Sequence, residues 1–350
     1  MSAPHAVLVT GGAGFIGSNL AHRMASQGRS VIVLDSLARP GVEANLEWLR
    51  STHGDRIEPV IADIRDTAVV QDCVARADAV FHMAAQVAVT TSLDDPIEDF
   101  SVNLVGTIAL LEAVRMASHR PALVFASTNK VYGDLSDLEL TAEDDGYRPV
   151  GAASGISEAR PLDFHTPYGC SKGAADQYVL DYARSFGVRA AVLRMSCIYG
   201  ERQMGTEDQG WVAHFLIRAL SGEPMTLYGD GLQVRDVLEV SDAVDAYVAA
   251  LDRIDAIAGR AFNLGGGPAN AVSLRQVIAE IGAIVGHPVP LCRADWRAGD
   301  QRYFVADTRR VRAALGLGEP TQWRDGLARL ARWLESTRQL QATPRIAISA

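Results

Sequence analysis

Short apolar runs alternate with helical patterns along the first half of the chain. Residues 7–9, 31–34 and 122–125 are continuous apolar runs, the pattern of parallel strands that are buried on both faces. Between the first two runs, apolar residues fall at helical spacing from Phe15 to Met24, and Gly28 provides a stop. This alternation predicts an α/β fold with a doubly wound parallel sheet and a ligand crevice at the carboxyl ends of its strands.

The alternation breaks after Tyr199 and Gly200, where glycine-rich turns and a basic stretch at residues 296–302 follow. A helix over residues 103–116 is apolar on more than one face, so it is expected to pack on the sheet and on a second surface. That surface is either a neighbouring segment of the same chain or another subunit. The polar, aperiodic residues 337–350 are predicted to form a frayed tail.

Composition and charge argue against several classes of function. The formal net charge is −9, whereas a nucleic-acid partner normally needs a basic face. No apolar run approaches the roughly 18 residues of a membrane span, and no signal peptide precedes the first strand pattern, so a cytoplasmic protein without membrane contact is expected. The four cysteines form no CxxC pair and the histidines no HxxxH or HxH spacing, which favours free thiols and no metal site.

A glycine-rich segment follows the first predicted strand and opens the first predicted helix. Glycines there allow a tight turn and bring backbone N–H groups close to a pyrophosphate at the helix N-terminus. The residues expected to hold the dinucleotide are Gly11, Gly14, Phe15, Ile16 and Gly17. Steric turns also use such glycines, but the second strand ends at Asp35, whose carboxylate can accept both hydroxyls of an adenosine ribose. Since this carboxylate would repel a 2′-phosphate, the sequence predicts NAD rather than NADP.

The predicted dinucleotide site divides the chain. Residues 1–195 are expected to form an NAD-binding Rossmann domain, and residues 196–340 a smaller C-terminal α/β substrate-binding domain. Within the second domain, residues around 235–265 are expected to return to the large sheet. Residues 341–350 remain as a tail.

A tyrosine and a lysine stand four residues apart at the start of a predicted helix. Pro167 marks the helix start, so Tyr168 and Lys172 share one face. An ammonium beside a phenol would lower the pKa of the phenol, which could then accept a proton from a sugar hydroxyl. Such a pair is often only a solvated surface pair, but Ser127 and Thr128 end the third apolar run, where ligands bind.

Residues 11–17, residues 127–133 and the pair Tyr168 and Lys172 together resemble the extended short-chain dehydrogenase/reductase family. Within it, the chain is similar to the nucleotide-sugar epimerases and dehydratases, and the resemblance runs to about Trp333. It implies that Thr128, Tyr168 and Lys172 are catalytic. It also implies further cofactor contacts from Asp63, Ile64, Met83, Ala84, Ala85, Gln86, Ser127, Tyr168 and Lys172. Substrate contacts are implied for Gln86, Thr128, Asn129, Cys197, Arg235, Arg297 and Asp300.

The sequence supports three of these implied substrate contacts to different degrees. Arg235 and Arg297 make chemical sense, because a planar guanidinium grips phosphate oxygens of the substrate's pyrophosphate in two places. Many family members have asparagine at the position of Cys197, so an amide contact does not carry over. This thiol is expected to be partly buried and inert.

The residues after Thr128 bear on the reaction. The dehydratases of the family have an Asp-Glu pair where this chain has Asn129 and Lys130. An amide cannot donate a proton as a carboxylic acid does, so dehydration is disfavoured. Longer segments, among them residues 86–92 and 208–212, resemble epimerases that invert C2 of a CDP-sugar such as CDP-paratose. The implied mechanism is oxidation to a 2-keto sugar by bound NAD, with Tyr168 as acid and base, followed by reduction on the other face.

Two alternatives remain open from the residues. One is a nucleotide-sugar 4-epimerase of the UDP-hexose type, since the same three catalytic residues serve both reactions. The other is a non-catalytic NAD-binding protein. The expected partners are a nucleotide-sugar substrate and further copies of the chain, as a homodimer or homotetramer through the helices at residues 103–116 and 168–184.

Overall fold

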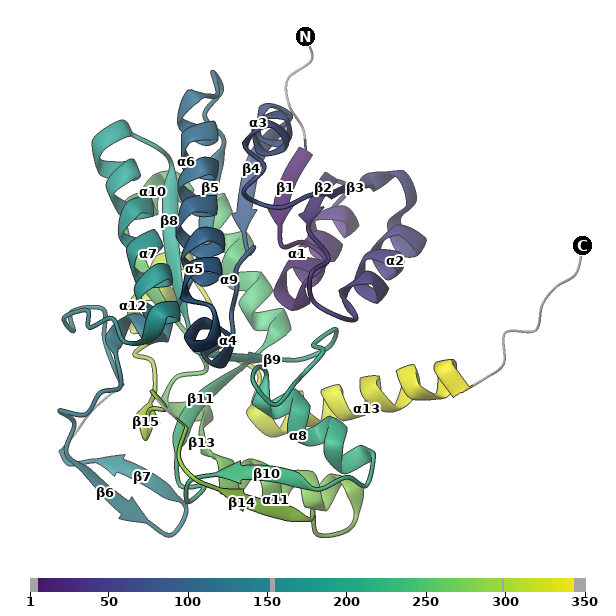
Figure 1. Cartoon of the computed structure of the whole chain (residues 1–350), viewed down its shortest axis with the longest axis vertical. Helices are drawn as coiled ribbons and strands as arrows, with labels where there is room; N and C mark the ends of the chain where they lie inside the picture. The colour runs from purple at the N-terminus through teal and green to yellow at the C-terminus, as the bar shows by residue number, and fades with distance from the viewer. Residues whose placement is uncertain (1–5, 152–154, 298, 343–350) are drawn as a thin grey trace, which may run out of the picture.

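The computed structural model describes residues 6–151, 155–297 and 299–342. Its centre is a parallel sheet of seven strands in the order β12-β8-β5-β4-β1-β2-β3 (Figure 1). The strands are β1 (Ala6–Thr10), β2 (Ser30–Asp35), β3 (Ile57–Ile61), β4 (Ala77–His82), β5 (Ala122–Thr128), β8 (Ala190–Met195) and β12 (Ala261–Leu264). All three predicted strands are confirmed, and so is the doubly wound α/β fold.

Helices cover both faces of this sheet. One face carries α1 (Phe15–Ser26), α2 (Val42–His53), α9 (Val240–Asp252), α10 (Ile254–Ile257) and α12 (Arg309–Leu315). The other carries α3 (Thr67–Ala75), α6 (Gly106–Met116) and α7 (Thr166–Phe186). Before α6 the chain forms α4 (Val89–Asp94), α5 (Pro96–Phe100) and a π-helical turn (Ser101–Val105). Short 3-10 turns lie at Gly54–Arg56, Asn129–Tyr132 and Pro268–Asn270.

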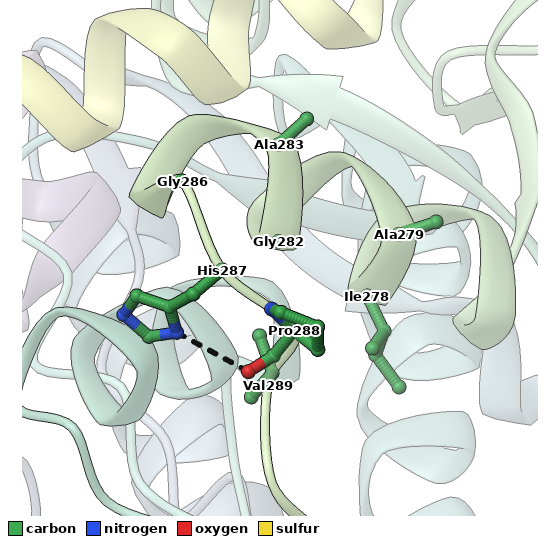
Figure 2. A pocket seen from close by; sticks show the side chains of 8 residues that line it. All are labelled: Ile278, Ala279, Gly282, Ala283, Gly286, His287, Pro288 and Val289. Carbon is green, nitrogen blue, oxygen red and sulfur yellow. Dashed lines mark hydrogen bonds between the residues drawn. The ribbon is translucent and has the colours of Figure 1, made fainter.

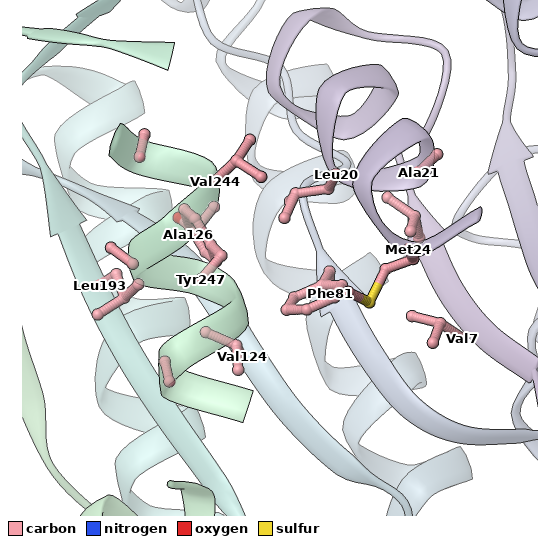
Figure 3. Close-up of a cluster of buried hydrophobic side chains, with 14 of the residues drawn as sticks. Val7, Leu20, Ala21, Met24, Phe81, Val124, Ala126, Leu193, Val244 and Tyr247 are labelled. Carbon is pink, nitrogen blue, oxygen red and sulfur yellow. The ribbon is translucent and has the colours of Figure 1, made fainter. Parts of the chain in front are cut away.

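The core on the first face joins segments that are far apart in the sequence. Figure 3 shows α1 and α9 side by side over the sheet, with Met24 of α1 pointing toward Phe81 of β4. The rings of Phe81 and Tyr247 meet edge to face at 6.3 Å. Burial of these large side chains fixes α9, which belongs to the second half of the chain, onto the dinucleotide-binding half.

The second half also forms small sheets of its own below the large one (Figure 1). In one, β11 (Val234–Glu239) pairs with β9 (Cys197–Tyr199), β13 (Ala271–Ser273) and β15 (Tyr303–Phe304). In a second small sheet, β10 (Met225–Tyr228) pairs with β14 (Leu291–Ala294). A further small pair, β6 (Leu140–Glu143) with β7 (Gly146–Pro149), comes from the first half of the chain. The helices here are α8 (Trp211–Leu220), α11 (Leu274–Val285) and α13 (Trp323–Ala342).

The observed elements can be compared with the expectations for the second half of the chain. Strand β12 lies at the edge of the large sheet, whereas β11, at the start of the segment expected to return there, belongs to a small sheet. The division at residue 195 stays a prediction. The tail was predicted too long, because α13 continues to Ala342; residues 343–350 lie outside the described residues. None of the described helices is long and apolar enough to cross a membrane.

Candidate active site

The glycine loop packs directly on the segment that follows β4. A Cβ on Gly11, whose φ is +65°, would lie 2.7 Å from the backbone N of Ala84, and a Cβ on Gly17 would lie 2.1 Å from the carbonyl O of Gly11. Both positions therefore require glycine for close backbone packing. Strands β1 and β4 are neighbours from which the sheet is built outward in both directions, so this contact marks the switch point where such sheets bind ligands.

Helix α1 begins at this loop and presents its N-terminus to the same crevice. Its N-cap is Gly14, and no side chain of the described residues caps it. The first-turn N–H groups therefore remain available for an anion, and the helix dipole adds partial positive charge. A Cβ at Gly14 would meet only the carbonyl O of Gly11, at 3.1 Å, so the backbone is open to a ligand there.

Asp35 ends β2 beside the loop, as predicted. Its Oδ2 accepts a hydrogen bond from the N–H of Ala13 and its Oδ1 one from the N–H of Leu37, each at 2.9 Å. These bonds hold a half-buried carboxylate at the place where an adenosine ribose would lie. The uncapped helix end, the glycine cradle and this carboxylate together fit NAD.

Asp63 and Ile64 follow β3 and make contacts within the protein. Arg65 donates to the Asp63 carboxylate through Nε at 2.8 Å and through a terminal nitrogen at 2.6 Å, and it also contacts Glu98. The hydrogen bonds from Arg65 lower the pKa of Asp63. Ile64 is buried, with its side chain against Gly106 at the start of α6. Their predicted contacts with the adenine stay a prediction.

Met83, Ala84, Ala85 and Gln86 follow β4, and Gln86 is tied into a buried network. Its side-chain nitrogen donates to Asp99 Oδ1 at 2.9 Å, and its backbone N–H donates to Asn103 Oδ1 at 2.9 Å. Its Oε1 accepts from the N–H of Ala88 at 2.6 Å. These bonds fix the backbone that lines the crevice, and a substrate contact from the Gln86 side chain would compete with them.

Tyr168 and Lys172 lie on the first two turns of α7, where Pro167 stands as predicted, and Thr128 ends β5. Burial raises the pKa of Tyr168 to about 12, while its hydrogen bond with Thr128 acts to lower it. Burial lowers the pKa of Lys172 to about 7, although the negative charges of Asp176 and Asp99 act to raise it. The structure thus brings the three predicted catalytic residues together.

Lys172 was expected to lower the pKa of the Tyr168 phenol, and this lowering is not found. Lys172 Nζ donates to the carbonyl O of Ala126 at 2.6 Å and lies 4.2 Å from the ring centre of Phe125. The pKa of Tyr168 is raised rather than lowered, because loss of solvent disfavours the phenolate more than the Thr128 hydroxyl stabilises it. The expectation failed because burial cannot be obtained from residue spacing.

A buried polar network behind Tyr168 was missed by sequence reasoning. Ser171 Oγ donates to Asp99 Oδ2 at 2.5 Å and accepts from Asn103 Nδ2 at 3.0 Å. His82 bridges the hydroxyls of Thr10 and Thr107 at 2.7 and 2.9 Å. All these side chains are buried, so they hold the crevice floor rather than face solvent.

A second missed group holds the end of β5. Asp176 forms a two-bond ion pair with Arg194, at 2.9 Å for each bond, and accepts a hydrogen bond from Ser127 Oγ at 2.7 Å. The Ser127 hydroxyl thus donates its hydrogen to Asp176, and its predicted contact with the cofactor stays a prediction. The signal was present, because Asp176 repeats the four-residue spacing of Tyr168 and Lys172 on one helix face.

Of the residues predicted for the substrate, Arg235 and Cys197 lie on a small sheet, whereas Asn129 lies at the end of β5. Arg235, on β11, is buried and forms an ion pair with Asp300 at 2.6 Å. Cys197, on β9, accepts a hydrogen bond from Trp211 Nε1 at 3.5 Å, and burial raises the pKa of its thiol. Asn129 is buried beside Thr128, whose hydroxyl lies 3.5 Å from Asn129 Oδ1. The substrate roles of these residues stay predictions.

Arg297 makes a different set of contacts. Its guanidinium lies 3.9 Å from the ring centre of Tyr228 and donates to the carbonyl O of Glu207 at 2.9 Å. The carboxylates of Glu207 and Asp208 are 3.6 and 3.8 Å away. Only about a quarter of this side chain is exposed (27 %), so these protein contacts fix the position of the guanidinium.

A separate cavity of about 570 Å³ lies on α11 (Figure 2). Its lining is made of small and apolar residues, and His287 directs Nδ1 to the carbonyl O of Pro288 at 3.2 Å. It includes none of the predicted site residues. Among the described residues, no three His, Cys, Asp or Glu side chains are grouped so as to hold a metal ion.

The chain belongs to the NAD dependent epimerase/dehydratase family, whose model matches residues 7–265. NAD is therefore its cofactor, in agreement with the glycine loop and Asp35. The predicted enzyme class, an isomerase of the epimerase type, is confirmed by epimerases among its relatives.

Two relatives and one solved structure describe this likeness. The chain is 42% identical over 337 residues to CDP-paratose 2-epimerase of Salmonella typhi, covering 94% of this chain and 99% of the relative. It is 33% identical over 335 residues to UDP-glucose 4-epimerase of Mycolicibacterium smegmatis, covering 95% and 99%. The UDP-glucose 4-epimerase of Thermus thermophilus, solved in complex with NAD, has a TM-score of 0.79 at 31% identity and covers 94% of this chain and 99% of its own.

Proposed function

We propose that the protein inverts C2 of a CDP-sugar, such as CDP-paratose, through a transient 2-keto sugar. The observation that carries this proposal is the 42% identity to a CDP-paratose 2-epimerase along almost the full length of both chains. The buried group of Thr128, Tyr168 and Lys172 supports it, since this group supplies a proton acceptor and donor beside a bound sugar.

The glycine loop and Asp35 would hold NAD, which would supply a hydride acceptor and donor beside the sugar carbon. Tyr168 Oη moves the hydroxyl proton in both directions. Only the phenolate form of Tyr168 can accept a proton, and burial disfavours that form. Lys172, on the same helix face, is the cation that would stabilise the phenolate once its ammonium turns from the carbonyl O of Ala126. Thr128 holds the sugar oxygen next to the phenol through its own hydroxyl.

The sugar must turn between the two transfers while its nucleotide stays in place. Arg235 and Arg297 suit this anchoring task, because each is held by protein contacts before substrate arrives. A guanidinium that is already positioned loses less conformational freedom when it binds a phosphate. The 2-keto sugar can then turn without leaving the site.

A 4-epimerase acting on a UDP-hexose is the second candidate. It is favoured by the 33% identity to UDP-glucose 4-epimerase of Mycolicibacterium smegmatis over 95% of this chain. Its chemistry would use the same three residues, with a different carbon placed beside Tyr168.

We also infer that the protein forms a homodimer through the helices around α7. Exposed apolar side chains gather on the helices that pack against one another there: Leu93, Ile97, Phe100, Val105, Tyr178 and Phe186. Water-exposed apolar surface of this kind on adjacent helices favours association with a second copy.

A panel of CDP-, UDP-, GDP- and dTDP-sugars, read by NMR for the inverted carbon, tests the proposed reaction. We expect inversion at C2 with a CDP-sugar. Tyr168→Phe should lower turnover by at least about a hundredfold and leave the NAD content unchanged. Tyr178→Phe, on the same helix but exposed, is the matched control and should keep full activity. Inversion at C4 of a UDP-hexose would overturn the proposal in favour of the 4-epimerase.

A further inference from the structure

Lysine is rare in this chain, and both lysines lie at the same site. Of the 33 basic residues, only Lys130 and Lys172 are lysines, and the rest are arginines. Lys172 belongs to the proposed catalytic group. Lys130 has no part in it, although it stands only two residues after Thr128.

The side chain of Lys130 reaches from the end of β5 to the substrate side of the crevice. Its Nζ donates to the carbonyl O of Gly299 at 3.1 Å. A Cβ on Gly299 would lie 3.0 Å from the side chain of Thr166, at the first residue of α7. The ammonium therefore lies close to the turn that carries Tyr168.

The same ammonium faces Arg235 and its carboxylate partner. Burial and the positive charge of Arg235 lower the pKa of Lys130 to about 8, while Asp300 and Cys197 act against this shift. Asp134 also acts to raise the pKa of Lys130, but its Oδ1 already accepts a hydrogen bond from the backbone N–H of Ser136 at 3.0 Å.

Gly299, whose carbonyl O accepts from Lys130, directly precedes Asp300, the carboxylate that pairs with Arg235. Asp300 lies 2.6 Å from the Arg235 guanidinium and neutralises only one of the two positive charges. A half-buried cation without a full counter-charge is unfavourable, and an anionic ligand that enters between the two groups relieves it.

We propose that Lys130 is a substrate-positioning residue that binds the diphosphate of the nucleotide-sugar and thereby places C2, rather than C4, beside Tyr168. This inference rests on the proposed function. C2 is joined to the phosphate through C1 and one oxygen, whereas C4 lies across the sugar ring. Lys130 is close to Thr128 in space as well, because its backbone N–H donates to the Thr128 hydroxyl at 3.2 Å. A phosphate bound at Lys130 therefore favours the near carbon, C2, beside the phenol over the far carbon, C4.

Isothermal calorimetry with CDP, UDP, dTDP and GDP on the NAD-loaded protein tests the contact. With the diphosphate that binds wild type best, Lys130→Met should bind at least about tenfold more weakly, which is the loss of one charge-assisted contact. Lys130→Arg keeps the charge and should bind within about threefold of wild type. Arg324→Gln removes an exposed charge on α13 and should bind as wild type does.

The NAD content of each variant shows whether the fold and the cofactor site are intact. Unchanged affinity in an NAD-loaded Lys130→Met protein would overturn this inference and leave the proposed function standing. If wild type binds none of the four diphosphates, the proposed substrate class fails, and this inference fails with it.

A second measurement does not depend on a variant. Trinitrobenzenesulfonate modifies uncharged lysine amines, and peptide mapping distinguishes Lys130 from the buried Lys172. We expect the bound diphosphate to protect Lys130 from modification. Labelling of Lys130 at the same rate with saturating diphosphate would contradict the proposed contact.

Discussion

His82 shows how strongly burial controls charge next to the site. Its ring bridges Thr10 and Thr107, and only 1% of the residue is exposed. Burial, together with the nearby charge of Lys172, lowers the pKa of His82 to about 3. The imidazole is therefore neutral in the folded protein throughout the range in which an exposed histidine takes up a proton.

This lowered pKa predicts a loss of stability in acid. Below about pH 6.5 the unfolded chain binds a proton at His82 that the folded chain does not, so the free energy of unfolding falls with pH until the folded pKa is reached. Between pH 7 and pH 5 the contribution is about 2 kcal/mol. Urea unfolding at both values should show that His82→Gln loses less stability than wild type by this amount.

His287→Gln, a change at an exposed histidine, serves as the control and should keep the wild-type dependence on pH. If His82→Gln and wild type lose the same stability between the two pH values, His82 is not the group responsible.

Single residues with a defined spacing could be placed from the sequence. Thr128, Tyr168 and Lys172 meet because a strand end and a helix start define where each side chain lies. Asn103 and Asp99 could not be found in this way. Their roles arise from hydrogen bonds to Ser171, which is distant in the sequence, and no local pattern encodes such a contact.

Among the elements, the buried parallel strands were predicted well because they are continuously apolar. The link between α1, α2 and the turn after β9 was not predicted. Asn19 donates to the carbonyl O of Glu201 at 3.1 Å, and Asn45 to that of Arg202 at 3.2 Å. Asn45 also donates to the carbonyl O of Ala13, in the glycine loop, at 3.1 Å. These long-range amide bonds tie the substrate side to the cofactor side, and asparagines on helices carry no sequence signal for them.

The helices around α7 also predict how the chain assembles. Leu110, Leu111 and Val114 of α6 are fully buried in the chain itself, so that part of the predicted second surface is internal. Exposed apolar side chains lie on α4, α5, the π-helical turn and α7, and α6 adds only Met116, its last residue. Ile97, which is 76% exposed, is the most open of them.

Gel filtration with light scattering tests this assembly. We expect wild type to elute as a dimer or larger and Ile97→Arg as a monomer, because a buried guanidinium without a partner opposes association. Leu291→Arg, on β14, exposes the same charge away from these helices and should elute as wild type does. A monomeric wild type, or an unchanged Ile97→Arg, would contradict the proposed interface.

At the scale of the whole molecule, the site combines two parts of the chain that the sequence pattern separated. The glycine loop, Asp35 and the end of β5 come from the large sheet, whereas Arg235 comes from a small sheet and Asp300 from the loop before β15. Helix α9 packs on α1 and holds the two parts together. The sequence pattern predicted both parts, but not their contact, which depends on how distant surfaces fit.

A CDP-paratose labelled with deuterium at C2 tests the central proposal most directly. Because the hydride leaves C2 and returns to it within one closed site, we expect the product to be inverted at C2, to keep its deuterium there and to contain no solvent hydrogen at that carbon. Loss of the label to water, or a product that keeps its configuration at C2, would contradict the account.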